Sequence, residues 1–170
     1  MKINLVKLTE DLNRLEFRVQ PGELGFDKNE QASMLFPNII DVDVEIQKFS
    51  DKYFLKVKLT TIVHYNCDRC LVDFDQTLKV DFQLIYSKYA SDQFEDDEFR
   101  FIDENETEID LGPDIRDNML LVLPMKHLCK ETCRGLCPHC GTNLNDETCD
   151  CEQQTIDPRW EKLKSLQFNN

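Results

Sequence analysis

Eight cysteines, arranged in four short pairs, constrain this chain more than any other feature of its sequence. Six of them fall within 23 residues, and the other two form a separate Cys-x-x-Cys pair. They are Cys67, Cys70, Cys129, Cys133, Cys137, Cys140, Cys149 and Cys151. Cysteines separated by one to three residues can bind one face of the same tetrahedral ion. The pairs therefore predict two sites of four thiolates, each holding one Zn²⁺ ion.

The spacing also favours one division of these ligands. Cys137 and Cys140, followed by Gly141, have the form of a zinc knuckle, in which backbone amides point at the sulfurs and glycine permits a tight turn. Cys149 and Cys151 begin nine positions beyond Cys140, after a loop long enough to fold back. We assign these four cysteines to one site.

The other four cysteines then form a second site between distant parts of the chain. They are Cys67, Cys70, Cys129 and Cys133. Two alternatives remain open at this point: Cys133 and Cys137 are close enough to share one ion, and His127 could replace Cys129 as a ligand. Rubredoxin-like iron at the Cys137 knuckle is a further alternative, which a coloured protein would reveal.

The composition indicates a folded protein of the cytoplasm. Hydrophobic residues make up 41% of the 170 residues, too large a share for a disordered chain. No apolar run reaches the roughly 20 residues that cross a bilayer, and the first residues lack the apolar stretch of a secretory signal. In the cytoplasm, clustered cysteines stay reduced and bind metal. A secreted disulfide scaffold is the competing interpretation.

Four segments alternate apolar and polar residues with the period of a β-strand. They are Leu15–Val19, Ile40–Ile46, Tyr53–Tyr65 and Leu78–Tyr86. The pattern predicts an antiparallel meander, with a turn near Asp51 and with Cys67 and Cys70 at a hairpin tip.

Two helices are expected. In the first, Asp110 is the cap, Pro113 lies in the first turn and Pro124 ends the helix. Its expected apolar stripe is Ile115, Met119 and Val122. The second covers Asp157–Leu166, with Trp160 on its apolar face.

These elements predict an α+β fold, mainly antiparallel β-sheet with a core helix and a C-terminal zinc-binding module. Residues 1–123 are expected to form the β-rich part, with an acidic loop near 91–108. Residues 124–170 are expected to form the Cys-rich zinc module and the terminal helix, packed on the first part.

The net charge of −13 is concentrated in one segment. Residues 91–110 hold ten acidic side chains and one basic one. Such a run is typical of a solvated loop. The alternative is an acidic arm that competes with RNA for a basic partner. A chain this acidic is poorly suited to tight, nonspecific binding of phosphate backbones.

The chemistry favours a structural role for the metal. Four thiolates saturate a zinc ion, whereas catalytic zinc keeps a position open. The three histidines, His64, His127 and His139, share no spacing with a carboxylate. We therefore expect no enzyme. The alternative is a thiol-redox enzyme using Cys67 and Cys70, or a metal-dependent enzyme; the redox motif would need a βαβ neighbourhood, not the strands predicted here.

Mildly basic stretches occur around the cysteines and on the terminal helix. The candidate nucleic-acid contacts are Lys126, Lys130, Arg134, Arg159, Trp160, Lys162 and Lys164. If the two stretches fold together, they form a modest positive patch with an aromatic ring beside it. The alternative is that Trp160 anchors its helix on the zinc module and the lysines form an ordinary solvated face.

Several motifs in order resemble one bacterial family. They are Cys67–Cys70, Leu123–Cys129, Cys133–Asn145, Cys149–Cys151 and Ile156–Trp160. Together they resemble the YceD family, the large ribosomal RNA subunit accumulation proteins, over residues 67–166; residues 1–66 match only in strand character. The family's cysteines correspond to all eight here, although forms lacking the later cysteines exist.

Membership would imply a cytoplasmic protein needed for normal accumulation of large-subunit ribosomal RNA, described as metal-binding and nucleic-acid-binding, with no established catalytic residues. We therefore expect a non-enzymatic zinc-binding accessory factor in ribosome biogenesis. Its expected partner is precursor ribosomal RNA or an early large-subunit ribosomal protein, with no membrane and no small-molecule substrate. An acidic protein–protein adaptor is a further alternative.

Overall fold

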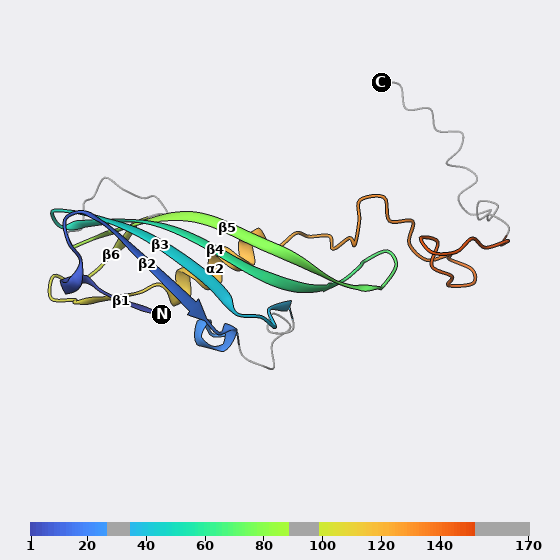
Figure 1. Ribbon diagram of the computed structural model, residues 1–170, viewed down its shortest axis with the longest axis horizontal. Helices are drawn as coiled ribbons and strands as arrows, with labels where there is room; N and C mark the ends of the chain where they lie inside the picture. Colours follow the sequence, from blue (N-terminus) through green and yellow to red (C-terminus); the bar gives the residue numbers. More distant parts are fainter. Residues whose placement is uncertain (27–34, 89–98, 152–170) are drawn as a thin grey trace, which may run out of the picture.

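The computed structural model describes residues 1–26, 35–88 and 99–151, and these form an α+β fold (Figure 1). Within them, a five-stranded sheet has the order β2-β3-β4-β5-β6, and a two-stranded sheet pairs β1 with β7. The strands are β1 (Lys2–Asn4), β2 (Leu12–Val19), β3 (Ile40–Phe49), β4 (Lys52–Asn66), β5 (Asp73–Ser87), β6 (Phe99–Phe101) and β7 (Glu108–Asp110). The helix is α2 (Gly112–Val122), and the short 3-10 turns are η1 (Leu5–Lys7) and η2 (Pro21–Leu24).

The large sheet is antiparallel from β2 to β5, and β6 adds a parallel edge. All four strands predicted from the period-two pattern are confirmed, and each is longer than its predicted segment. Along β4 the buried side chains alternate with exposed ones from Tyr53 to Tyr65. One face of the sheet therefore carries the core, while the other presents charged side chains such as Lys56 and Lys58 to solvent.

The β4–β5 hairpin is the longest element of the fold. It stays in register from Lys52 opposite Ser87 to Asn66 opposite Asp73. Since β3 pairs with β4 only as far as Thr60, the end of the hairpin and its loop extend beyond the neighbouring strand (Figure 1). The prediction that Cys67 and Cys70 lie at a hairpin tip is confirmed.

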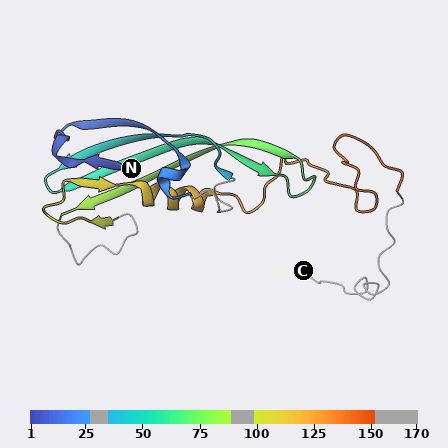
Figure 2. The same ribbon diagram turned by 90° about the horizontal axis from the view of Figure 1, so that it is seen from below.

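Helix α2 lies against the core face of the sheet (Figure 2). Asp110, the predicted cap, accepts the Gly112 amide at 2.9 Å, although the N-cap position itself is Leu111. Ile115 and Met119 are fully buried, as expected. Val122 is not part of this buried stripe, because its side chain is 46% exposed. The buried residues of the helix are spaced four apart, and the next position in that series is Leu123, which packs against the core.

A buried carboxylate ties the helix to the sheet edge. The Tyr86 hydroxyl donates to Asp114 Oδ2 at 2.7 Å, and the Arg100 guanidinium donates to Asp114 Oδ1 at 3.0 Å. Burial and this hydrogen bond raise the pKa of Tyr86 far above its ordinary value. The three groups join β5, β6 and α2, so the parallel strand is fixed by a side-chain network as well as by its ladder.

Two segments expected from the sequence lie partly or wholly outside the described residues. Strand β6 and the turn from Asp103 to Glu106 lie within the acidic loop expected near 91–108, so its second half is structured; residues 91–98 lie outside the described residues. The helix expected at Asp157–Leu166 also lies outside them. The division of the chain at residue 123 stays a prediction.

Candidate metal centres

The first candidate centre joins the β4–β5 hairpin tip to the segment that follows α2. Its four thiols all lie within 4.8 Å of one another. They belong to Cys67, Cys70, Cys129 and Cys133. Cys67 Sγ lies 3.8 Å from Cys133 Sγ, and Cys70 Sγ lies 3.6 Å from Cys129 Sγ. A tetrahedron with zinc–sulfur bonds of about 2.3 Å has edges of about 3.8 Å, so these separations fit one four-coordinate ion.

The second candidate centre is built from the last described part of the chain. Its four thiols also lie within 4.8 Å of one another. They belong to Cys137, Cys140, Cys149 and Cys151. This is the division that the spacing favoured, and it places Cys133 and Cys137 in different groups. Unlike the first centre, which has three buried cysteines, the second has two cysteines exposed to solvent, Cys140 and Cys151.

The two Cys-x-x-Cys loops share one backbone geometry. In the first, the Leu71 amide donates to the Cys67 carbonyl at 2.9 Å; in the second, the Gly141 amide donates to the Cys137 carbonyl at 2.9 Å. Both residues after the second cysteine have positive φ, 60° for Leu71 and 75° for Gly141. The knuckle predicted for the second loop is thus repeated in the first, with leucine where glycine is favoured.

The residues between Cys67 and Cys70 brace the first centre. Asp68 Oδ2 accepts the His127 amide at 2.6 Å, and Arg69 Nη1 donates to the Cys133 carbonyl at 2.9 Å. The Arg69 carbonyl in turn accepts the Leu136 amide at 3.1 Å. Gly135, with φ of 76°, lies so close that an added Cβ would be 3.0 Å from this carbonyl. Sequence reasoning missed these contacts, because each joins segments about 60 positions apart.

The thiols of the first centre differ in pKa. Burial raises the pKa of Cys67, but backbone hydrogen bonds near Cys129 and Cys70 outweigh it and lower the pKa to about 6. Burial and the neighbouring Cys70 thiol raise the pKa of Cys129 to about 12. One thiol of this centre therefore ionises readily and another resists ionisation.

The thiols of the second centre also differ in pKa. Hydrogen bonds with the Thr142 hydroxyl and amide lower the pKa of Cys140 to about 6. A hydrogen bond with Cys140, together with burial, raises the pKa of Cys151 to about 12. Four adjacent thiolates repel one another, so a cation is needed to keep all four ionised near neutral pH. Both groups have the donor chemistry of a four-thiolate metal site.

The histidines lie outside both groups. The His127 ring stacks on Tyr65 with centroids 4.2 Å apart, and the first group contains Cys129 and not His127. His64 Nδ1 lies 2.8 Å from Asp75 Oδ1 on the exposed face of the sheet. His139 is exposed.

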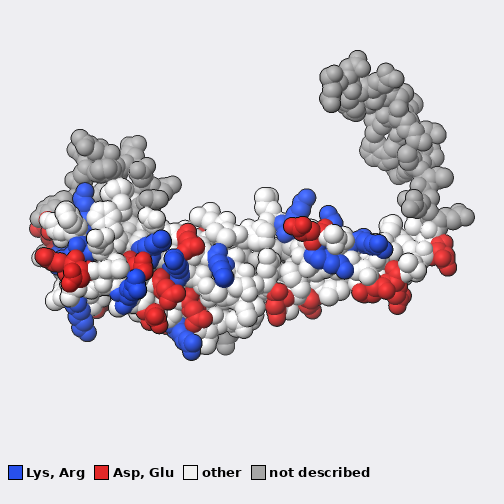
Figure 3. Space-filling view, turned by 45° about the horizontal axis from the view of Figure 1, so that its top comes forward, with Lys and Arg blue, Asp and Glu red and all other residues white. Residues whose placement is uncertain are grey.

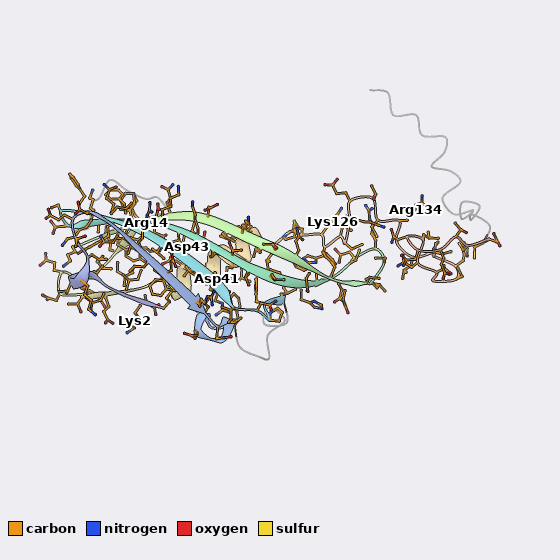
Figure 4. The ribbon with its side chains drawn as sticks, viewed as in Figure 1. Lys2, Arg14, Asp41, Asp43, Lys126 and Arg134 are labelled. Carbon is orange, nitrogen blue, oxygen red and sulfur yellow. The ribbon has the colours of Figure 1, made fainter. Side chains whose placement is uncertain are left out.

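The described candidate nucleic-acid contacts lie in the segment 126–134, which also carries Cys129 and Cys133. Lys126, Lys130 and Arg134 are exposed, and within the described ranges their side chains form no ion pair. Figure 3 shows several Lys and Arg side chains over this part of the molecule, with Asp and Glu side chains among them, below them and beyond them. Figure 4 places Lys126 alongside the outer end of the β4–β5 hairpin and Arg134 beyond its tip, both far from Arg14, Asp41 and Asp43 on the sheet. The other candidates, Arg159, Trp160, Lys162 and Lys164, lie outside the described residues.

Comparison with known proteins identifies the family of this chain. Residues 55–167, which contain all eight cysteines, match the family described as "Large ribosomal RNA subunit accumulation protein YceD". The chain belongs to the YceD family. An uncharacterized protein of Mycobacterium tuberculosis is 33% identical over 132 residues, covering 75% of this chain and 62% of that protein. One of Mycobacterium leprae is 28% identical over 128 residues, covering 75% and 58%.

A plant member of the YceD family is also similar. It is the large ribosomal RNA subunit accumulation protein YCED homolog 1, chloroplastic, of Arabidopsis thaliana, 24% identical over 155 residues, covering 75% of this chain and 48% of that protein. The chain thus spans about three fifths of the length of the mycobacterial relatives it matches. No solved structure matches it. Within the described residues, no helix is long and apolar enough to cross a membrane.

Proposed function

We propose that the protein is a non-enzymatic, zinc-binding accessory factor in ribosome biogenesis that supports the accumulation of large-subunit ribosomal RNA. The observation that carries this proposal is the pair of four-thiol groups in a chain of the YceD family. Four sulfur ligands complete the coordination of zinc and leave no position for a substrate. The metal would therefore maintain architecture instead of performing chemistry.

Zinc is the metal that these groups suit best. Tetrahedral four-thiolate sites select zinc or iron–sulfur chemistry over calcium or magnesium, which prefer oxygen ligands. At the first centre, Zn²⁺ would hold the hairpin tip, through Cys67 and Cys70, against the segment containing Cys129 and Cys133. At the second, it would close the loop from Cys137 to Cys151. The free energy of binding then becomes folding free energy for both segments.

The partner in this proposal is precursor ribosomal RNA or an early large-subunit ribosomal protein. Three exposed basic residues, Lys126, Lys130 and Arg134, form the contact at the end of the molecule nearest the first centre. The rest of the chain is acidic, so long-range attraction to phosphate is limited to this end. Binding would depend on the shape held by the metal centres and not on net charge.

Crosslinking in cells tests this proposal directly. Changing Lys126, Lys130 and Arg134 together to alanine should reduce recovery of precursor RNA or of a large-subunit protein at least tenfold, while zinc content stays at two ions. A matched control changes Lys56, Lys58 and Lys79, which are exposed on the outer face of the sheet, and should leave recovery unchanged. If neither class of partner is attached to the unaltered protein, the proposal is wrong.

A thiol-redox enzyme is the second candidate, and the low pKa of Cys67 and of Cys140 is the observation that favours it. The two candidates differ in thiol accessibility. In a saturated structural site, alkylating reagents should modify the cysteines only after a chelator removes the metal. Rapid modification of Cys67 in the metal-loaded protein would favour the redox enzyme.

A further inference from the structure

The loop that closes the second centre also reaches a sulfur of the first. Asn145 lies between Cys140 and Cys149, two ligands of the second centre. Its side-chain nitrogen Nδ2 donates to Cys133 Sγ of the first centre at 3.3 Å. Its side-chain oxygen Oδ1 accepts the Arg134 amide at 2.9 Å. One part-buried side chain thus connects the loop of one centre to a ligand of the other.

The orientation of this side chain is fixed by its own loop. Asn143 Oδ1 accepts both the Asn145 amide, at 3.1 Å, and Asn145 Nδ2, at 2.8 Å. Asn143 Nδ2 donates in turn to Asp146 Oδ2 at 2.7 Å. The amide nitrogen that faces Cys133 is therefore held by a set of contacts that exists only while the loop keeps this conformation.

The backbone joins the same two regions. Only Arg134, Gly135 and Leu136 separate Cys133 from Cys137. The Leu144 amide donates to the Gly135 carbonyl at 2.9 Å, and Leu136 forms a β-bridge with Asn143. The closing loop of the second centre is thus packed on the three-residue linker, and its displacement would move both the linker and Asn145.

A hydrogen bond from a neighbouring side chain orients a metal ligand and strengthens its bond to the metal. A donor that the second centre holds in place therefore strengthens the first centre only while the second is intact. We propose that Asn145 is a positioning residue that couples the two centres, so that zinc in the second centre increases zinc affinity at the first. By linkage, zinc in the first centre increases affinity at the second by the same factor. This inference rests on the proposed binding of zinc.

A double-mutant cycle on the full chain tests the coupling. The second centre is disabled by changing Cys149 and Cys151 to serine, with and without Asn145→Ala. Zinc is removed by a competing chelator, and release at the first centre is followed by alkylation of Cys67 and Cys70, resolved by mass spectrometry. With Asn145 present, loss of the second centre should weaken the first about 10- to 100-fold, the usual effect of losing a partner of a metal ligand.

The Asn145 variants of the cycle show whether the coupling acts through this side chain. Asn145→Ala should weaken the first centre by a similar factor and make it insensitive to loss of the second. Asn145→Asp, which keeps the size of the side chain but replaces the donor with an oxygen, should have the same effect even if the alanine variant folds poorly. Asn66→Ala is the matched control, because Asn66 donates to a carboxylate, that of Asp73, beside the same hairpin tip.

Two results would overturn the coupling while leaving the proposed function intact. One is unchanged zinc affinity at the first centre in both Asn145 variants. The other is an equal loss of affinity on disabling the second centre, with and without Asn145. An unaltered protein that binds no zinc at either centre would instead overturn both this inference and the proposed function.

Discussion

The two candidate metal centres have the same four-thiol donor set but different surroundings. In the first, Cys67, Cys70 and Cys133 are 0–4% exposed and pack against side chains of the sheet and the following segment. In the second, Cys140 and Cys151 are exposed, and the hydrogen bonds around the sulfurs come from the centre's own loop. The comparison separates two roles for metal: at the first centre it would join distant segments, and at the second it would shape one segment.

The difference follows from how each site is assembled along the chain. The first centre closes a contact between residues 59 and 66 positions apart, so its ligands meet only when the sheet and the later segment are both in place. The second centre lies within 15 residues. Because closing a long loop costs more conformational entropy than closing a short one, the first centre depends more on the surrounding fold.

The largest difference should appear when one ligand of each centre is removed. Cys67→Ser leaves three thiols, two of them buried, without a complete ligand set, so zinc content should fall from two ions to one. The free energy of unfolding should fall by about 4 kcal/mol or more, the range reached by loss of a buried metal. Metal analysis and denaturant unfolding, followed by circular dichroism of the sheet, measure both effects.

The matched variant is Cys151→Ser at the second centre. It should also lose one ion, but the free energy of unfolding should fall by only about 1–3 kcal/mol. The first centre, which joins the hairpin of the sheet to the later segment, keeps all four of its ligands. The sheet is therefore affected only through weaker zinc binding at the first centre. Equal losses of stability in the two variants would show that burial does not distinguish the centres.

Acidification should release zinc from both centres with a similar dependence on pH. Two thiols in each group have a raised pKa and carry protons at neutral pH without metal: Cys70 and Cys129 in the first, Cys149 and Cys151 in the second. Binding displaces these protons, so affinity rises with pH and falls as pH falls. The displacement of at least these two protons corresponds to about 100-fold or more in affinity per pH unit.

The dependence should steepen below a pH of about 6, because Cys67 and Cys140 then also carry protons that zinc must displace. Competition with a chromophoric chelator between pH 5.5 and 7.5 measures this, with single-centre variants separating the two sites. A pH-independent affinity would contradict four-thiolate binding at the centre concerned.

The features that could be predicted from the sequence are local ones. Strand β4 alternates buried and exposed residues from Tyr53 to Tyr65, and this pattern is visible in the sequence because one face of the sheet is solvated. The pairing of Cys137 with Cys140 is equally local. The grouping of distant cysteines could then be reached by elimination, since each tetrahedral site needs four ligands.

The features that were missed depend on contacts across the chain. Nothing in the order Asn143-Leu-Asn145 indicates that the second asparagine faces a sulfur of the other centre. Asp114 has the sequence context of an ordinary first-turn helix acid, yet it is buried against Tyr86 and Arg100. Val122 is the opposite case. Its helical spacing predicted a buried side chain, but Val122 is exposed and the core contact at this end of the helix is made by Leu123.

A smaller effect should distinguish the bracing of the two centres. Both Asp68 and Asp150 lie between two ligands of a centre and are exposed, but Asp68 also accepts the His127 amide from the facing segment. Asp68→Ala should therefore weaken zinc binding at the first centre about 10-fold, because an amide of the facing segment loses its acceptor. Asp150→Ala should leave the second centre within about twofold. Site-resolved chelator competition measures both, and a larger loss from Asp150→Ala would reverse the assignment.

The smallest expected effect concerns the residue that follows each Cys-x-x-Cys pair. Leu71 and Gly141 occupy the same place in their loops, both with positive φ, but a leucine in this conformation is strained by about 1–2 kcal/mol. Leu71→Gly relieves that strain and also increases the freedom of the unfolded chain, which costs about 0.5–1 kcal/mol. Because Leu71 is 66% exposed, little packing is lost.

We therefore expect Leu71→Gly to stabilise the folded protein by up to about 1 kcal/mol and Gly141→Ala to destabilise the second loop by about 1 kcal/mol. An added Cβ at Gly141 meets no atom within 4 Å, so the second change reports backbone strain without a clash. Thermal unfolding measures the first change, and zinc affinity at the second centre measures the other. Destabilisation by Leu71→Gly would mean that the exposed leucine makes a stabilising contact that outweighs its strain, and the two knuckles would then differ in kind and not only in burial.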